Sequence, residues 1–387
     1  MHIAFLTNEY PQEGFPHGGI GTSVKALAQG LVERGHRVSV VGINYVSKEE
    51  VVEDGLLAIH GLPRFNFPGI AWWVQSEKIN KRLREIHERH PIDIVEGAEN
   101  SLAFISKFDG PRFVIRCNGG HQFFSDAENK PTGGWRVFQE RRSFRKADLV
   151  FGVSNHVLSK TAEFLEFEDR RGPVIFNPVD ASKFTPMRDV TPVKGRLLFF
   201  GTVCEKKGIR QLIRAMPRIK SHFPDAHLLI AGRDSIHTNG GSYSEDVRKE
   251  IPDSIRESIQ FLGAVPNEQL PQMIAEADVC VLPSHMEAMP LAWLEVLSMG
   301  RPFVAGNTGP GAEVVRDEVT GLLCNPHDPD DIAEKVIQFL SNDELKKTLG
   351  ENARRDVLER FDVPVIVEKY IKHYEALIAK SSAVSSK

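Results

Sequence analysis

The chain has 387 residues, which is too many for one ordinary domain and enough for two of similar size. Hydrophobic residues make up 41% and charged residues 26% of it, a balance that excludes a disordered or fibrous protein. The 48 basic and 52 acidic residues leave a net charge of −4, which excludes a protein whose main task is non-specific binding to nucleic acid.

The cysteines and the first residues bear on the cellular compartment. The four cysteines form no CxxC pair, so we expect neither a zinc finger nor a disulfide framework. The apolar start reaches polar residues at Thr7, too early for a signal peptide, and no stretch approaches the roughly 20 apolar residues of a membrane span. We therefore expect a cytoplasmic protein.

The first half of the chain alternates strands with helices. An apolar run at 2–7 indicates a buried strand, and a loop rich in glycine and proline follows over 11–21. An apolar stripe over 24–31 has the spacing of an amphipathic helix, Gly35 stands where a helix cap is expected, and 37–41 is the next strand. This βαβ unit implies parallel pairing. Further strands are expected at 92–96, 112–116, 149–153 and 174–176.

The same alternation restarts after a proline-rich stretch at 178–195, beginning with a strand at 196–200 and a helix at 208–220. Three helices are expected from Asp328 onward. The later strands are expected at 226–231, 259–262, 278–282 and 303–305, and the helices near 244–257, 267–276, 290–299 and 311–316. The fold class is therefore α/β, with two doubly wound Rossmann-like domains and a ligand site expected in a central cleft, beyond the carboxyl ends of the strands.

Two glycine-containing turns are candidate phosphate sites. Gly18-Gly19-Ile20-Gly21 lies between a strand and a helix, where backbone N–H groups can meet an anion, although a plain tight turn explains it equally well. The spacing does not match GxGxxG, so a nicotinamide enzyme is a poor fit. In the second half, Lys206-Lys207-Gly208 precedes a helix, and it is either a phosphate-binding turn or a solvated surface turn.

The strongest local signal is the segment 284–295, in which a loop carries Glu287 and an apolar helix carries Glu295. Glutamate is rarely buried without a partner, so Glu295 either binds ribose or sugar hydroxyls or forms an ion pair with an arginine. We keep both interpretations open at this point.

These motifs, taken together, resemble the retaining glycosyltransferases of family four, the glycogen-synthase-related group with the GT-B fold. Glu287 and Glu295 match the E-x7-E motif of that family, and Gly201…Lys207-Gly208 matches its G-R…K-G element. The segment 174–184 is similar to its I-P-N-G-V-D…F hinge. Because the motifs follow one another in the right order over almost the whole chain, the resemblance is specific.

The resemblance implies roles in the second domain. Lys207 is implied to bind the donor phosphates and to stabilise the departing nucleoside diphosphate, Glu287 to contact the transferred sugar, and Glu295 to bind the ribose. The backbone N–H groups implied to meet the sugar and phosphate belong to Ala288, Met289, Leu291 and Ala292.

In the first domain, the resemblance places Gly18 and Gly19 against the donor diphosphate and His121 against the donor sugar. The implied catalytic residues are thus Glu287, His121 and Lys207.

The sequence departs from the family pattern at Thr202, where the family carries a phosphate-binding arginine. A threonine brings no charge to the donor-binding site. Either another cation substitutes, with Arg196, Lys206 and Arg233 as candidates, or diphosphate binding is weaker.

The implied reaction moves a sugar from a nucleoside-diphosphate sugar to an acceptor hydroxyl with retention of configuration, in glycan, glycolipid or cell-surface polysaccharide biosynthesis. We expect no metal or other cofactor: Asp328-Pro329-Asp330 spells a DxD motif, but its place before a helix indicates an N-cap. The alternative is a non-catalytic nucleotide-sugar or carbohydrate-binding protein on the same fold, and a phosphorylase or epimerase is a weaker third interpretation.

The expected partners are the nucleotide-sugar donor and a carbohydrate or lipid-linked acceptor, without nucleic acid. The helix at 78–89 is either a basic membrane-docking helix or an ordinary surface helix, so a peripheral contact at the inner membrane face stays open. Aromatic residues that form either an acceptor platform or core packing are Phe65, Phe67, Trp72, Trp73, Phe123 and Phe124. The predicted domains are residues 1–185 plus 364–387, with a final helix crossing back, and residues 186–363.

Overall fold

The computed structural model describes residues 1–12, 18–44, 48–236 and 240–385, so residues 13–17 of the glycine- and proline-rich loop lie outside the described part. The chain divides into two compact units. Unit 1 consists of Met1–Pro178 and Val363–Lys387, and unit 2 consists of Val179–Asp362.

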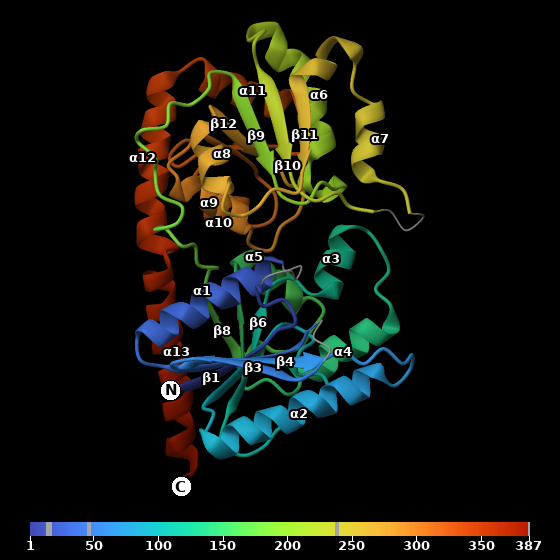
Figure 1. The fold of residues 1–387 in the computed structure, drawn as a ribbon, viewed down its shortest axis with the longest axis vertical. Coiled ribbons are helices and arrows are strands. Elements are labelled where there is room, and N and C mark those ends of the chain that lie inside the picture. Colours follow the sequence, from blue (N-terminus) through green and yellow to red (C-terminus); the bar gives the residue numbers. More distant parts are fainter. Residues whose placement is uncertain (13–17, 45–47, 237–239, 386–387) are drawn as a thin grey trace. The chain divides into compact units, whose positions relative to one another are not determined.

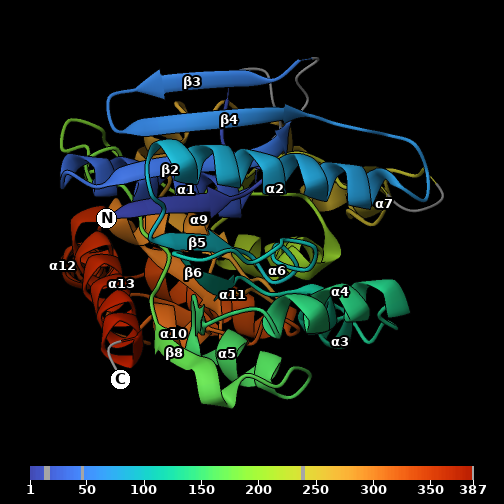
Figure 2. The same cartoon turned by 90° about the horizontal axis from the view of Figure 1, so that it is seen from below.

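The core of unit 1 is an eight-stranded sheet with the order β3-β4-β2-β1-β5-β6-β7-β8. All neighbouring strands pair in parallel except β3 with β4, which form an antiparallel hairpin at one edge (Figure 2). The strands are β1 (His2–Leu6), β2 (Arg37–Asn44), β3 (Glu50–Asp54), β4 (Leu57–Pro63), β5 (Ile94–Gly97), β6 (Arg112–Cys117), β7 (Leu149–Gly152) and β8 (Arg171–Val174).

Helix α1 (Gly19–Glu33) and the C-terminal helix α13 (Val363–Ser385) lie side by side in unit 1 (Figure 1). The predicted apolar stripe of α1 is buried, and Gly35 follows the helix with φ of 78°, as expected of a glycine cap. Gly30 lets the two helices approach, because a Cβ there would meet the side chains of Val363 and Val367. The remaining helices of unit 1 are α2 (Ala71–Arg89), α3 (His121–Ala127), α4 (Gly134–Phe144) and α5 (Asn155–Ala162).

The core of unit 2 is a six-stranded, wholly parallel sheet with the order β11-β10-β9-β12-β13-β14. Its strands are β9 (Arg196–Phe200), β10 (His227–Ala231), β11 (Ile259–Gly263), β12 (Val279–Leu282), β13 (Phe303–Gly306) and β14 (Leu322–Cys324). Its helices are α6 (Ile209–His222), α7 (Tyr243–Lys249), α8 (Leu270–Glu276), α9 (Leu291–Ser298), α10 (Gly311–Val314), α11 (Pro329–Leu340) and α12 (Asp343–Arg360), with short 3₁₀ turns η2 (Glu205–Lys207) and η3 (Asp253–Ser258).

Both sheets follow the strand order of doubly wound nucleotide-binding folds. Counted along the chain, the strands of unit 2 run 3-2-1-4-5-6, and those of unit 1 follow the same order from β4 to β7. The order reverses between β1 and β5 in unit 1 and between β9 and β12 in unit 2. The crevice outside the carboxyl ends of these strands is where such folds bind ligands, so these two places are where a site is expected.

The structure corrects several predicted boundaries. The strand expected at 174–176 is β8, which ends at Val174, and the helix expected at 244–257 is split into α7 and η3 ahead of and after Pro252, which cannot donate a helical hydrogen bond. The first unit ends at Pro178 rather than at 185, because Val179 already pairs with Asp362 of unit 2.

Candidate active site

In unit 2, two distant segments meet at the carboxyl ends of β9 and β12. Gly208 makes the approach feasible: it has φ of 71°, and a Cβ there would overlap the carbonyl oxygen of Pro283. The backbone N–H of His285 donates to the carbonyl of Lys206 at 2.8 Å. As a result Lys207 Nζ forms an ion pair with the carboxylate of Glu287, with the two side chains only 22% and 12% exposed.

Helix α9 begins beside this ion pair. The helix starts at Leu291 rather than at Pro290, which takes the N-cap position. The N–H groups of Leu291 and Ala292 donate to no acceptor within the described residues, as is usual for the first turn of a helix. Ala288 and Met289 are buried in the preceding loop. The start of α9 thus presents N–H donors and partial positive charge next to Lys207.

Glu295 lies one turn into α9 and is partly exposed. Burial raises the pKa of its carboxyl to about 7, while the charge of Lys183 acts in the opposite direction. The arginine partner that sequence reasoning left open is absent from the described part of the chain, where no ion pair includes Glu295. Its carboxylate is therefore available to accept hydrogen bonds from a ligand.

Thr202 is exposed just after β9, and the structure separates the three candidate replacement cations. Arg196 was a wrong candidate: it is the first residue of β9, at the opposite end of the strand, where it pairs with Glu276 at 2.6 Å. Arg233 follows the neighbouring β10, and its carbonyl accepts the N–H of Val203 at 2.8 Å. Its exposed side chain makes no ion pair among the described residues, and Lys206 lies on the η2 turn.

In unit 1, His121 is the first residue of α3, which follows β6. The N-terminus of α3 is held from α4 by Glu140, whose buried carboxylate accepts the N–H of His121 and, at 2.9 Å, the side-chain amide of Gln122. Glu99 accepts the N–H of Asn118 at 2.5 Å, and burial raises the pKa of Glu99 to about 7. These two carboxylates fix the backbone that carries His121, and sequence reasoning missed both.

Gly18 is the N-cap of α1 and Gly19 is its first residue. The carboxylate of Glu9 lies so near that a Cβ on Gly18 would be 2.7 Å from Glu9 Oε2. A Cβ on Gly21 would overlap the carbonyl of Glu9, so this glycine is required by close packing. The start of α1 therefore faces a carboxylate, and the structure adds nothing that favours an anion there over a tight turn.

The DxD sequence caps a helix, as predicted. Asp328 is the N-cap of α11, and its side chain accepts the N–H of Asp330 at 2.9 Å. In the part of the chain that the structure describes, no three His, Cys, Asp or Glu side chains are grouped as they would be to hold a metal ion.

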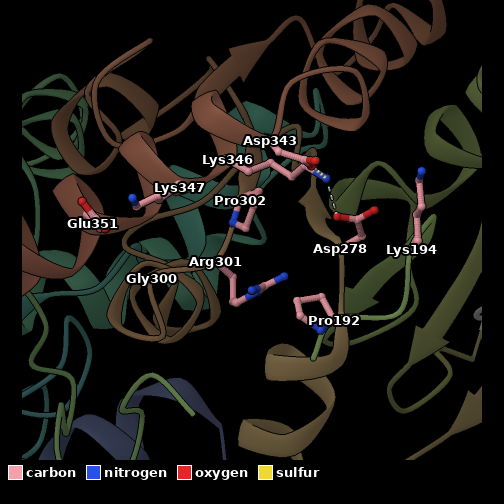
Figure 3. A pocket seen from close by; sticks show the side chains of 10 residues that line it. All are labelled: Pro192, Lys194, Asp278, Gly300, Arg301, Pro302, Asp343, Lys346, Lys347 and Glu351. Atoms are coloured by element: carbon pink, nitrogen blue, oxygen red, sulfur yellow. Dashed lines mark hydrogen bonds and ion pairs between the residues drawn. The ribbon is translucent and has the colours of Figure 1, made fainter. Parts of the chain in front are cut away.

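A cavity of about 510 Å³ lies at the other edge of the unit 2 sheet. Its lining residues Lys194, Asp278 and Pro302 come just before β9, β12 and β13, so they mark the amino ends of the strands (Figure 3). Lys346 is held there by Asp278 and Asp343, each at 2.8 Å. This cavity is remote from Lys207 and Glu287 and is not part of the candidate site.

The structure thus groups the predicted residues by unit. Unit 2 brings together Lys207, Glu287 and the start of α9 with Glu295. Unit 1 carries His121 at the carboxyl edge of its own sheet and Gly18 and Gly19 at the start of α1. No helix among the described residues has the length and apolar character needed to cross a membrane.

Comparison with known families agrees with this geometry. Residues 17–183 match the family described as Glycosyltransferase Family 4, and residues 191–356 match Glycosyl transferases group 1. The chain is a family four glycosyltransferase of group 1. Its two Rossmann-like units are the two halves of the GT-B fold.

Relatives span nearly the full length of this glycosyltransferase. The chain is 26% identical over 386 residues to the GDP-mannose-dependent alpha-(1-6)-phosphatidylinositol monomannoside mannosyltransferase of Mycolicibacterium smegmatis, covering 93% of this chain and 94% of the relative. The solved sucrose-phosphate synthase of Thermosynechococcus elongatus superposes with a TM-score of 0.83 at 20% identity, over 98% of this chain and 99% of the other. HepE of Anabaena, solved with UDP and glucose, superposes with a TM-score of 0.72 at 17% identity, over 97% of this chain and 100% of the other.

Proposed function

We propose that this glycosyltransferase moves a sugar from a nucleoside-diphosphate sugar to an acceptor hydroxyl with retention of anomeric configuration. The observation that carries the proposal is the grouping of Lys207, Glu287 and the N–H donors of α9 at the point where the strand order of unit 2 reverses. The solved HepE binds UDP and glucose, and the mycobacterial relative is GDP-mannose-dependent, which supports this class of donor.

In the proposed reaction, the bond from the anomeric carbon to the leaving phosphate oxygen breaks and a bond from that carbon to the acceptor oxygen forms on the same face. Negative charge grows on the diphosphate, whose leaving oxygen takes the proton of the acceptor hydroxyl. Lys207 and the N–H groups of Leu291 and Ala292 stabilise that charge, which is where preorganised donors accelerate a reaction most. When the donor binds, Glu287 exchanges its contact with Lys207 for the hydroxyls of the transferred sugar, and Glu295 accepts hydrogen bonds from the ribose hydroxyls. For His121 we propose the role that the resemblance implies, contact with the donor sugar.

Phosphate charge at this site is neutralised by Lys207, by α9 and by Arg233, which takes the place of the missing arginine at position 202. Arg233 suits this role because it leaves the strand next to β9 at the same edge and has no acidic partner among the described residues. With these cations in place, we propose that transfer needs no metal ion. Undiminished transfer after treatment with a chelator tests this point.

We propose a glycan or lipid-linked acceptor, reached from the cytoplasm at the inner membrane face. The named activity of the mycobacterial relative supports a lipid-linked acceptor, and the exposed side chains of Phe67, Ile70 and Arg141 favour contact with an anionic membrane surface. Two cations of α2 are less suitable, because Arg82 pairs with Glu49 and Lys81 with Glu85. Sedimentation with phosphatidylglycerol vesicles tests the contact, and Ile70→Asp is expected to weaken it.

The decisive experiment incubates the full chain with a panel of UDP-, GDP- and ADP-sugars and an acceptor extract, and measures release of nucleoside diphosphate and the anomeric configuration of the product. Release with one donor and an α-linked product from an α-linked donor supports the proposal. Binding without release or transfer would establish the non-catalytic alternative. Inversion of configuration would overturn the retaining mechanism.

A further inference from the structure

A second pocket, of about 220 Å³, lies at the carboxyl edge of the unit 1 sheet, where the strand order reverses. Thr7 and Asn8, directly after β1, form one wall, and Asn100, after β5, forms another. Helices α2 and α4 close it with Gln75 and Gln139. The volume is below the roughly 300–1,000 Å³ of pockets for drug-sized ligands, so it suits a single sugar ring.

The lining of this pocket, as far as the chain is described, contains no charged side chain. It offers amides and hydroxyls instead. The side chains of Asn100, Ser101 and Gln139 make no hydrogen bond to any described residue, whereas Gln75 is held in place by donating to the carbonyl of Phe65 at 2.7 Å. Amides supply both donors and acceptors, which is what a set of sugar hydroxyls requires.

Aromatic rings form the remaining wall. Trp72 and Phe104 line the pocket with ring centroids 4.3 Å apart, and Trp135 of α4 lies within 5.7 Å of both. Trp72 and Trp135 are 39% and 48% exposed, which is unusual for such large apolar groups. An exposed ring beside hydrogen-bonding amides suits a pyranose, since one face of the sugar is apolar and its rim is polar.

The pocket is linked to the backbone that carries His121. Glu99 and Glu140 hold the segment Asn118–His121, and their chain neighbours Asn100 and Gln139 line the pocket. A ligand in the pocket therefore contacts the same two short segments that position His121.

We infer that this pocket binds the acceptor as an uncharged saccharide and excludes phosphorylated or acidic sugars. The statement that the bound saccharide is the acceptor rests on the proposed function. A phosphate or carboxylate placed here would lose its water and find no cation in exchange, so it would bind unfavourably. A neutral sugar would exchange its water for amide and hydroxyl partners and lose little.

The test measures tryptophan fluorescence of the full chain during titration with methyl glycosides of mannose, glucose, galactose and N-acetylglucosamine, and with mannose 6-phosphate, glucose 6-phosphate and glucuronic acid. We expect at least one neutral glycoside to bind and the charged sugars to bind at least tenfold more weakly. Equal or tighter binding of a charged sugar overturns the inference, and so does the absence of binding by every neutral glycoside.

Trp72→Ala and Gln139→Glu are expected to weaken saccharide binding at least tenfold. Trp73→Ala is the matched control, because Trp73 is the neighbouring, more exposed tryptophan and does not line the pocket. If both tryptophan variants behave alike, or if only phosphatidylglycerol vesicles and no saccharide change the fluorescence, the pocket is not a saccharide site.

Failure of this inference is distinguishable from failure of the proposed function. Donor-dependent release of nucleoside diphosphate without neutral saccharide binding leaves the transferase and removes the acceptor assignment. Saccharide binding without any release of nucleoside diphosphate would leave the saccharide pocket and remove the proposed transferase activity.

Discussion

The carboxyl edges of the two sheets use their charged residues in opposite ways. In unit 2 the side chains of Lys207, Glu287 and Glu295 lie beside the carboxyl ends of β9 and β12 and, among the described residues, hold no backbone N–H group. In unit 1 the carboxylates of Glu99 and Glu140 turn inward onto backbone N–H groups, and the pocket beside them is lined by amides and aromatic rings. The same strand order thus supports one charged edge and one neutral edge.

This difference matches two chemical tasks. A diphosphate leaving group needs cations and N–H donors at the point where charge develops. An uncharged saccharide acceptor needs hydrogen-bonding partners and a rigid wall but no counter-charge. The charges in unit 1 are therefore expected to act on stability and positioning, and those in unit 2 on binding and turnover.

The largest expected effect is on turnover in unit 2. Lys207→Ala removes a charged donor to the leaving diphosphate, and we expect kcat to fall about 10²–10³-fold, in line with the loss of one donor from a preorganised site. The melting temperature should also fall, because the Glu287 carboxylate, only 12% exposed, is left without its cation; kcat is therefore compared at a temperature at which both proteins are folded. Steady-state release of nucleoside diphosphate measures the first, and thermal unfolding the second.

The matched control is Lys194→Ala, an exposed lysine at the amino edge of the same sheet. It should leave turnover unchanged. A normal kcat for Lys207→Ala would remove this lysine from the mechanism.

The next largest effect is on unit 1. The carboxylate of Glu140 accepts hydrogen bonds from two backbone N–H groups and from the side-chain amide of Gln122. Glu140→Gln leaves one acceptor oxygen instead of two, so the free energy of unfolding should fall by about 1.5–3 kcal/mol. The expected readout is a melting temperature lowered by several degrees, with transfer reduced because His121 is displaced. Glu128→Gln, at the other end of α3 and exposed, is the control. An unchanged melting temperature would show that Glu140 does not hold this helix.

Periodicity was sufficient to predict the regular parts of the fold. The run at 2–7 and the stripe at 24–31 correspond to β1 and α1, since each has one face or both faces buried. The hairpin β3–β4 carried no such signal: every residue of β3 is exposed, so its pattern is that of a surface loop. Arg196 has the charge that a phosphate site needs, but it is the first residue of β9. It therefore lies at the amino end of the strand and cannot serve a site at the carboxyl edge.

The site was predictable only where a motif reports it. Glu287 and Glu295 stand out as acids in an apolar segment, and Lys207 precedes Gly208, whose positive φ and close approach to Pro283 both favour glycine. Glu140 lies in the charged run Gln139-Glu140-Arg141-Arg142 and looks like a surface residue. Its burial follows from the packing of α4 on α3, a long-range contact that the local sequence does not encode.

The inward carboxylates also predict how stability depends on pH. Burial raises the pKa of Glu99 to about 7, so between pH 4.5 and 7 the unfolded chain ionises this group while the folded chain does not. Its contribution to stability is therefore complete below pH 4.5 and is lost as pH rises through 7. Glu99→Gln keeps the acceptor for Asn118 but cannot ionise. From pH 5 to pH 8 its free energy of unfolding should therefore rise by about 2 kcal/mol relative to that of the unchanged chain.

Thermal unfolding of the two proteins at pH 5, 6, 7 and 8 measures this gain. Glu88→Gln, on the exposed side of α2, should give a difference that does not vary with pH. A variant that is equally destabilised at every pH would show that Glu99 is ionised in the folded state.

The smallest expected effect concerns Glu295 of unit 2, whose carboxyl has a pKa raised to about 7 by burial. Ribose hydroxyls donate to an ionised carboxylate, so binding of the nucleotide sugar requires loss of this proton. We expect affinity to be about tenfold weaker at pH 6 than at pH 8, because one pKa unit corresponds to a factor of ten. A nucleotide sugar is the right probe, since its diphosphate has no terminal phosphate to titrate in this range.

Glu295→Gln should bind the nucleotide sugar more weakly at pH 8 and lose the pH dependence, whereas Glu99→Gln should retain that dependence. If the Glu99 variant loses the pH dependence instead, then Glu99 of unit 1, and not Glu295 of unit 2, governs donor binding. The proposed difference between the two sheet edges would then be wrong.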